Sequence, residues 1–130
     1  MRRLLMLCCV ALLLPLCGVA QSRYKGAHLR LQQTSCNFGE VSRSGENRRC
    51  VVSFTNDGTE PLVLFAAITS CSCLKVNFSR KPIPAGAKGE IELLVDVKKM
   101  DKGIFHRVVQ LRSNSVGGTE NLTVEGKAKD

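Results

Sequence analysis

Apolar and polar residues alternate along most of the chain from residue 28 to its end. Because successive side chains of an extended strand point to opposite faces, this period of two predicts half-buried β-strands. Glycine, proline and asparagine turns separate the alternating stretches, and the strongest turn signal, residues 56–59, predicts a positive φ at Gly58. The predicted strands lie within residues 28–38, 50–55, 61–68, 74–78, 89–98, 105–112 and 122–125. About seven short strands without a helical period predict an all-β, immunoglobulin-like antiparallel sandwich.

Two stretches depart from simple alternation. In the first predicted strand, residues 28–38, the apolar residues change from odd to even positions at Gln33 and Thr34, which predicts a strand with a kink. The third predicted strand has apolar residues on both of its faces over residues 62–68, which predicts a strand covered on both sides. The outward parity also carries more apolar residues than a lone sandwich needs, namely Val51, Phe65, Ala67, Leu94 and Val108. These predict either an exposed patch for a partner or positions covered by loops and an extra strand.

The N-terminal residues have the three-part pattern of a signal peptide, with a basic start, an apolar run and a small Gly-Val-Ala triplet. We therefore predict a leader over residues 1–20, a flexible tether over residues 21–27 and one sandwich domain over residues 28–130. The apolar run is too short to span a bilayer, so the exported protein, periplasmic or secreted, is not expected to be an integral membrane protein. A lipid anchor on Cys17 is the alternative, which the bulky Leu16 before it disfavours.

Charge and composition narrow the class of partner. Loss of Arg2 and Arg3 with the leader lowers the formal net charge from +8 to +6, and the basic residues are spread along the chain. The chain has one tyrosine and no tryptophan to stack on bases, so nucleic acid is not an expected partner. An anionic glycan or an acidic protein surface fits the basic excess better, with Lys98, Lys99 and Lys102 in one predicted loop.

Four cysteines follow the predicted leader: Cys36, Cys50, Cys71 and Cys73. In an extended strand, residues two apart lie on one face about 6.6 Å from each other, near the upper limit for a disulfide. Cys71 and Cys73 are therefore open to three interpretations: a strained redox-active pair, two ligands for a soft metal, or structural cysteines that pair elsewhere or stay as buried thiols. The third interpretation is favoured because a bond between them needs a bent backbone.

Cys36 and Cys50 are expected to form a cross-strand bridge. A hairpin centred on Arg43 places both on the parity of Phe38 and Val52, with opposite Cβ atoms about 5 Å apart. This pairing predicts a disulfide that holds the first two strands together.

The sequence offers little support for catalysis. His28 and His106 have no evident partner in sequence, and Glu92 and Asp96 alternate with Lys98 as a solvated strand face does. No nucleophile elbow, zinc-binding helix or phosphate loop is present. We therefore expect no enzymatic activity, no cofactor and no metal.

Several short motifs follow one another along the chain: Phe38-Gly39-Glu40-Val41, Asn56-Asp57-Gly58, Ser70-Cys71-Ser72-Cys73, residues 82–86 and Ser113-Asn114. In this order they resemble the DUF1573 family of secreted bacterial domains, which are common in Bacteroidetes. The resemblance covers residues 36–126 and implies an immunoglobulin-like fold related to ASH and Hydin domains, with no established activity. Ser72 stands where the family has glycine, and the lost flexibility weakens the redox interpretation of the cysteines. By analogy we expect a non-enzymatic interaction module of the bacterial envelope, with a small thiol redox or soft-metal protein as the alternative.

Overall fold

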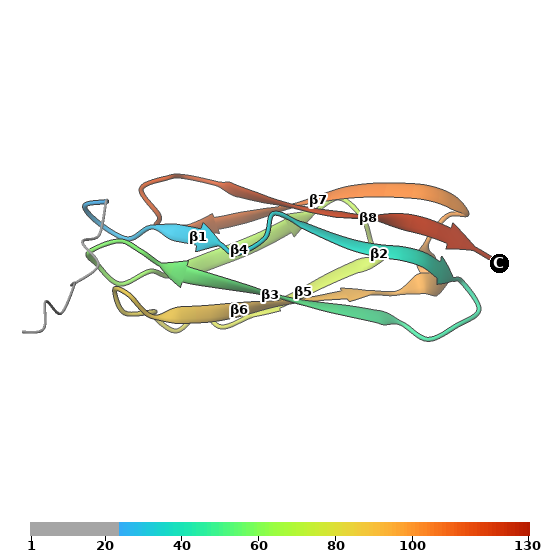
Figure 1. Cartoon of the computed structure of the whole chain (residues 1–130), viewed down its shortest axis with the longest axis horizontal. Helices are drawn as coiled ribbons and strands as arrows, with labels where there is room; N and C mark the ends of the chain where they lie inside the picture. Colours follow the sequence, from blue (N-terminus) through green and yellow to red (C-terminus); the bar gives the residue numbers. More distant parts are fainter. Residues whose placement is uncertain (1–23) are drawn as a thin grey trace, which may run out of the picture.

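The computed structural model describes residues 24–130, which form two four-stranded β-sheets packed face to face (Figure 1). The first sheet has the order β1-β3-β6-β5 and the second the order β2-β8-β7-β4. The strands are β1 (Leu29–Leu31), β2 (Ser35–Ser42), β3 (Arg48–Asn56), β4 (Leu64–Thr69), β5 (Leu74–Phe78), β6 (Lys88–Val95), β7 (Gly103–Ser113) and β8 (Glu120–Lys129). The predicted immunoglobulin-like sandwich is confirmed.

The alternation along the strands builds the core between the two sheets. On β6, Ile91, Leu93 and Val95 are fully buried, whereas the residues between them face outward and are half-exposed. The facing sheet contributes Val109 and Leu111 of β7 in the same way. These apolar rows meet in the middle of the sandwich and remove their side chains from water, which is the main stabilising term of such a fold.

The first predicted strand is two strands, so the predicted count of seven is one short. β1 pairs antiparallel with β3 in one sheet, and β2 pairs parallel with β8 in the other. The chain crosses between the sheets at residues 32–34, where the apolar parity changes. Sequence alternation cannot separate a kink from a change of sheet, because both alter the parity in the same way.

β4 is wrongly predicted as a strand covered on both faces. Among residues 24–130 it is an edge strand that pairs only with β7, and its outer side chains Phe65 and Ile68 are 55% and 40% exposed. Leu64 points into the core, and a bulge lies between Leu64 and Ala66. The apolar second face of this strand is therefore a surface.

The predicted outward apolar set is not one patch. Val51 and Leu94 lie on the outer face of the first sheet, whereas Phe65 and Val108 belong to the second sheet, on the opposite side. Ala67 packs against the core beside Leu111. Whether outward residues form one patch depends on which sheet each strand belongs to. Alternation shows only which side of its own strand a residue occupies.

The fifth predicted strand ends early, at Val95. A single 3-10 turn, η1 (Val97–Lys99), follows it, and the Asp96 carboxylate accepts a hydrogen bond from the Lys98 N–H at 3.3 Å. Val97 remains buried in this turn. Because Val97 is apolar and buried, it continues the alternation of β6 in the sequence although it lies in the turn and not in the strand.

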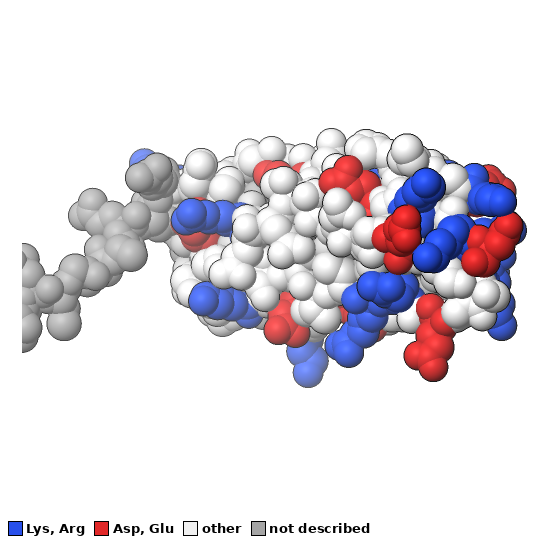
Figure 2. Space-filling model, turned by 45° about the vertical axis from the view of Figure 1, so that its right-hand side comes forward, with Lys and Arg blue, Asp and Glu red and all other residues white. Residues whose placement is uncertain are grey.

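Charged side chains gather at the end of the sandwich that carries the C-terminus (Figure 2). Several of them form exposed ion pairs, including those of Asp130 with Arg43 and Lys102 and of Glu40 with Lys129. Within residues 24–130, no helix has the length and hydrophobicity needed to cross a bilayer.

The predicted leader lies outside the described residues, but the last part of the predicted tether does not. Ala27 is buried, and the Gly26 N–H donates to the Thr59 hydroxyl at 2.8 Å. Gly26 and Ala27, at the end of the predicted tether, therefore pack on the domain.

Candidate functional site

The loop between β4 and β5 carries the chain from one sheet to the other and holds a disulfide between Cys71 and Cys73. The expectation that these cysteines would pair elsewhere or stay as thiols is wrong. The loop turns between them, with the Leu74 N–H donating to the Cys71 carbonyl at 3.2 Å, and their Cα atoms are 5.2 Å apart. The bent backbone that a bond requires comes from the change of sheet.

Backbone hydrogen bonds hold this loop in place. The Cys71 N–H donates to the Thr69 hydroxyl at 3.3 Å, and the Cys73 carbonyl accepts from the Asp96 N–H at 2.8 Å. The Cys73 N–H also contacts the Cys71 sulfur at 3.3 Å. Cys73 is buried and Cys71 is half-buried. Of the two cysteines, Cys71 is therefore the more exposed to a thiol from solution.

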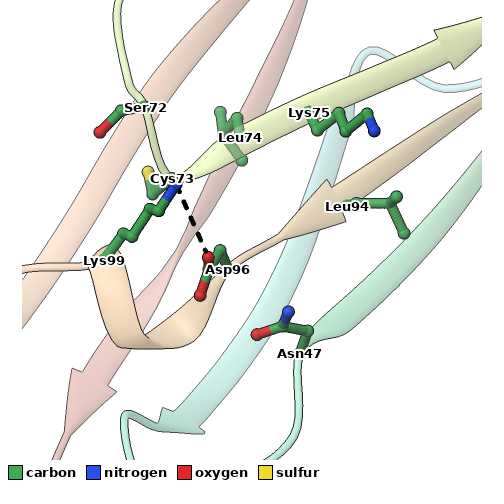
Figure 3. Close-up of a pocket in the computed structure, with 8 residues that line it drawn as sticks. All are labelled: Asn47, Ser72, Cys73, Leu74, Lys75, Leu94, Asp96 and Lys99. Atoms are coloured by element: carbon green, nitrogen blue, oxygen red, sulfur yellow. Dashed lines mark ion pairs between the residues drawn. The ribbon is translucent and has the colours of Figure 1, made fainter.

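A shallow hollow of about 270 Å³ lies beside this disulfide (Figure 3). Its lining includes Cys73, Leu94 and Asn47, with the cationic side chains Lys75 and Lys99 at its border. The Lys99 ammonium lies 4.0 Å from the Asp96 carboxylate, which leaves Lys75 as the lining cation with no ion pair among the described residues. The hollow is smaller than most sites for drug-sized ligands.

Cys36 and Cys50 form a second sulfur pair, but not in a hairpin. β2 and β3 belong to different sheets, so the two cysteines face one another across the sandwich, and both are free thiols. The Gln33 amide contacts both sulfur atoms, at 3.5 Å for Cys36 and 3.9 Å for Cys50. Burial, and then the neighbouring Cys50 thiol, raise the pKa of Cys36 to about 12.

His28, expected to have no partner, is part of a side-chain cluster. Its Nδ1 pairs with the Asp57 carboxylate, and its ring stacks on Tyr24 with centroids 3.6 Å apart. Gly117 lies against the other ring nitrogen, where an added Cβ would come within 3.2 Å of it. The cluster joins the start of the domain to the β3–β4 turn. The partners are far apart in sequence, so no local pattern could have revealed them.

The remaining predicted site residues lie on the outer faces of the sheets and apart from one another. His106 is exposed on the outer face of β7, opposite Glu125 of β8. Glu92 pairs with Arg49 at 2.6 Å, and a hydrogen bond from the Asn77 amide, followed by the Arg49 guanidinium, lowers the pKa of this carboxyl. Among residues 24–130, no three histidine, cysteine or acidic side chains come together as a metal site. The bond between Cys71 and Cys73 also removes the two thiolates that a soft metal would need.

Comparison of the fold places the chain among immunoglobulin-like sandwiches. A protein of unknown function from Porphyromonas gingivalis W83 superposes with a TM-score of 0.69 at 17% identity, over 85% of this chain and 50% of that one. The chain thus spans about half the length of that protein. The ASH/PapD-like domain 7 of human CEP192 gives 0.60 at 10% identity, over 78% and 85% of the two chains. The periplasmic chaperone SfaE gives 0.56 at 6% identity, over 78% and 58%.

No curated protein matches the chain in sequence. A family model for proteins of unknown function, DUF1573, matches residues 29–128, which include all eight strands except the last residue of β8. The resemblance drawn from the sequence motifs is confirmed, and the chain belongs to the DUF1573 family.

Proposed function

We propose that this domain is exported and serves as a non-catalytic interaction module that holds an extended segment of an envelope protein along the free edge of β4. The observation that carries the proposal is the chemistry of that edge. Natural proteins protect exposed strand edges with lysine, proline or a covering loop. β4 has the sequence Leu-Phe-Ala-Ala-Ile-Thr, without a charge or a proline, and its outer side carries exposed Phe65 and Ile68.

Strand addition suits this edge because unpaired backbone groups supply hydrogen bonds and the alternate side chains supply contact area. Ile68 lies opposite Gln110 of β7, and the exposed Val108 lies diagonally beside it on the same outer face. A partner strand next to β4 would cover Phe65 and Ile68 with its own outward side chains. An extended protein segment uses both features at once, because its backbone and its alternate side chains have the same spacing as those of β4.

The basic residues give weaker support for an anionic glycan. Lys99 and Lys102, two of the three lysines of the predicted basic loop, already lie near Asp96 and Asp130. Exposed pairs of this kind leave only a small net field, which salt screens further. We therefore favour an extended protein segment, with the remaining positive charge steering an acidic partner.

Export is supported by the leader pattern at the N-terminus and by the disulfide between Cys71 and Cys73. Disulfides persist in the periplasm and outside the cell and are rare in the cytosol. The similarity to a periplasmic chaperone supports the fold, and it suggests this compartment only by analogy.

The proposal can be tested by photo-crosslinking in the native host. A photoreactive amino acid at Ile68 should give one discrete crosslinked partner, and the same substitution at Val51 should give none. Val51 is the matched control because it is equally exposed, at 39% against 40%, on the outer face of the other sheet.

Substitution should then remove the interaction without unfolding the domain. Phe65→Lys with Ile68→Lys should abolish the crosslinks from a third probe at Ala66, whereas Val51→Lys should leave them unchanged. Both variants change exposed side chains and should keep the melting temperature of the parent. Equal crosslinking at Ile68 and Val51 would refute the assignment of the partner to β4.

A second candidate function, thiol redox exchange, is favoured by one observation: Cys71 and Cys73 are bonded although they are only one residue apart. Attack by a substrate thiolate at the half-buried Cys71 sulfur would release Cys73 as the thiolate. In a disulfide-reductase assay, turnover that both Cys71→Ser and Cys73→Ser abolish would establish this function over the binding module. No turnover above the buffer rate would exclude it.

A further inference from the structure

Cys36 and Cys50 lie on strands of different sheets, β2 and β3, at a place where the two sheets approach each other. β2 is the edge strand of one sheet, and its neighbour there is β8. β1 covers β3 only over Phe54–Asn56, so the part of β3 that includes Cys50 has an open side. The Gln33 side chain, from the crossover between β1 and β2, spans the gap and contacts both sulfur atoms.

The two thiols differ in what can reach them. Cys36 is 3% exposed and is in contact with the core, whereas Cys50 is half-buried at the open side of β3. Burial and the Cys50 thiol hold the pKa of Cys36 near 12, so at neutral pH Cys36 is a neutral thiol out of contact with solutes. A solute meets Cys50 first.

We propose that Cys36 and Cys50 are a reversible dithiol–disulfide site that links the two sheets covalently, with Cys50 as the attacking thiol and Cys36 as the resolving thiol. The oxidant is a small-molecule disulfide of the glutathione class.

The reaction balances in two exchange steps. The Cys50 thiolate attacks one sulfur of the oxidant, a mixed disulfide forms on Cys50, and one oxidant thiolate leaves and takes up the proton from Cys50. Cys36 then loses its proton to solvent and attacks the Cys50 sulfur, which releases the second oxidant thiol. The protein loses two electrons and two protons in total, and the oxidant disulfide is reduced to two thiols.

This site is separate from the bond between Cys71 and Cys73. That bond lies in the β4–β5 loop, whereas Cys36 and Cys50 lie in β2 and β3. β6 and β5 follow β3 in the first sheet, and β8 and β7 lie between β2 and β4 in the second. The two cysteine pairs can therefore be oxidised and reduced independently.

The test uses the whole protein with Cys36 and Cys50 as thiols. After incubation with oxidised glutathione, acid quenching and alkylation, non-reducing peptide mapping should find one new linked peptide pair, Cys36 with Cys50. The bond between Cys71 and Cys73 should be unchanged. If both cysteines remain fully alkylated, or if the new links join either of them to Cys71 or Cys73, the proposal is wrong.

Single variants test the order of the two steps. Cys36→Ala should accumulate glutathione on Cys50, because the resolving thiol is missing. Cys50→Ala should take up no glutathione at Cys36 while folded, and should take it up in urea. Cys36→Val, which keeps an apolar side chain in the strand, replaces the alanine variant if that variant does not fold. Equal adduct formation at Cys36 and Cys50 in the folded variants would refute the assigned roles.

Discussion

At the scale of the residue, Asn56 shows how one buried polar side chain organises the end of the sandwich. It is fully buried, and its Oδ1 accepts from the N–H groups of His28 and Gly58 at 3.2 and 3.1 Å. Its Nδ2 donates to the carbonyls of Glu60 and Ile83 at 2.8 and 2.9 Å. The bonds to Gly58 and Glu60 close the turn after β3, and those to His28 and Ile83 reach distant segments, so this side chain joins three stretches of chain in one place.

Asn56→Ala should therefore cost about 3 kcal/mol of unfolding free energy, because it leaves buried backbone donors and acceptors without partners. Asn121→Ala, on the exposed face of β8, is the matched control and should change stability by less than about 0.5 kcal/mol. Urea unfolding monitored by circular dichroism measures both values. Equal small losses in the two variants would show that water replaces the Asn56 contacts.

Burial of Cys36 makes the stability of the domain depend on pH in the alkaline range. Its pKa rises from 9.0 to about 12 on folding, so the folded state binds this proton more tightly than the unfolded chain does. The stabilisation is fully present below pH 9 and is lost as the pH rises to about 12. Urea unfolding at pH 8 and at pH 11 should show a larger loss for the parent than for Cys36→Ala, with both kept reduced. An identical loss in the two would contradict the shift.

At the scale of the element, the β4–β5 crossover illustrates a disulfide that shapes a loop more than it stabilises the fold. Closure of so short a loop removes little entropy from the unfolded chain, worth roughly 1.5 kcal/mol compared with about 3 kcal/mol for a 15-residue loop. The bond between Cys71 and Cys73 instead fixes the direction in which the chain leaves one sheet and enters the other.

Cys71→Ala with Cys73→Ala should accordingly lower the unfolding free energy by only about 1.5 kcal/mol. The variant should keep its strands and its crosslinks from β4. Urea unfolding of the oxidised parent and of the double variant, compared at one pH, measures the difference. A loss above about 4 kcal/mol would show that the bridge holds the sandwich together.

At the scale of the whole molecule, the two sheets are held by apolar packing and by the loops that cross between them. A bond between Cys36 and Cys50 would add a covalent link between β2 and β3, which share no sheet. Because it closes a loop of about 15 residues, it should stabilise the domain by roughly 3 kcal/mol.

Calorimetry of the oxidised and reduced forms tests this value. The oxidised parent should melt well above its reduced form, since about 1 kcal/mol shifts the melting temperature by several degrees in a domain of this size. Cys50→Ala removes this bond but keeps the bond between Cys71 and Cys73. In this variant oxidation should raise the melting temperature only by the smaller amount that the short loop provides.

The sequence by itself determined the strands, most of their inward faces and the family. Alternation placed Ile91, Leu93 and Val95 in the core correctly, because a strand in a two-layer fold exposes one face and buries the other. The turn at residues 56–59 was also predicted, but Gly58 is needed there for another reason. The φ of Gly58 is not positive, contrary to the prediction. Glycine is needed because a Cβ at this position would lie 2.0 Å from the Gly26 carbonyl oxygen.

Tertiary structure alone decided which strands share a sheet, and most corrections follow from that. Alternation reports only which side of its own strand a residue occupies, so it could not place Val51 and Phe65 on opposite faces of the molecule. For the same reason it paired Cys36 with Cys50 through a hairpin that does not exist. His28 and Asp57 meet only because the folded chain brings β1 beside the β3–β4 turn, a contact between distant segments that no local pattern encodes.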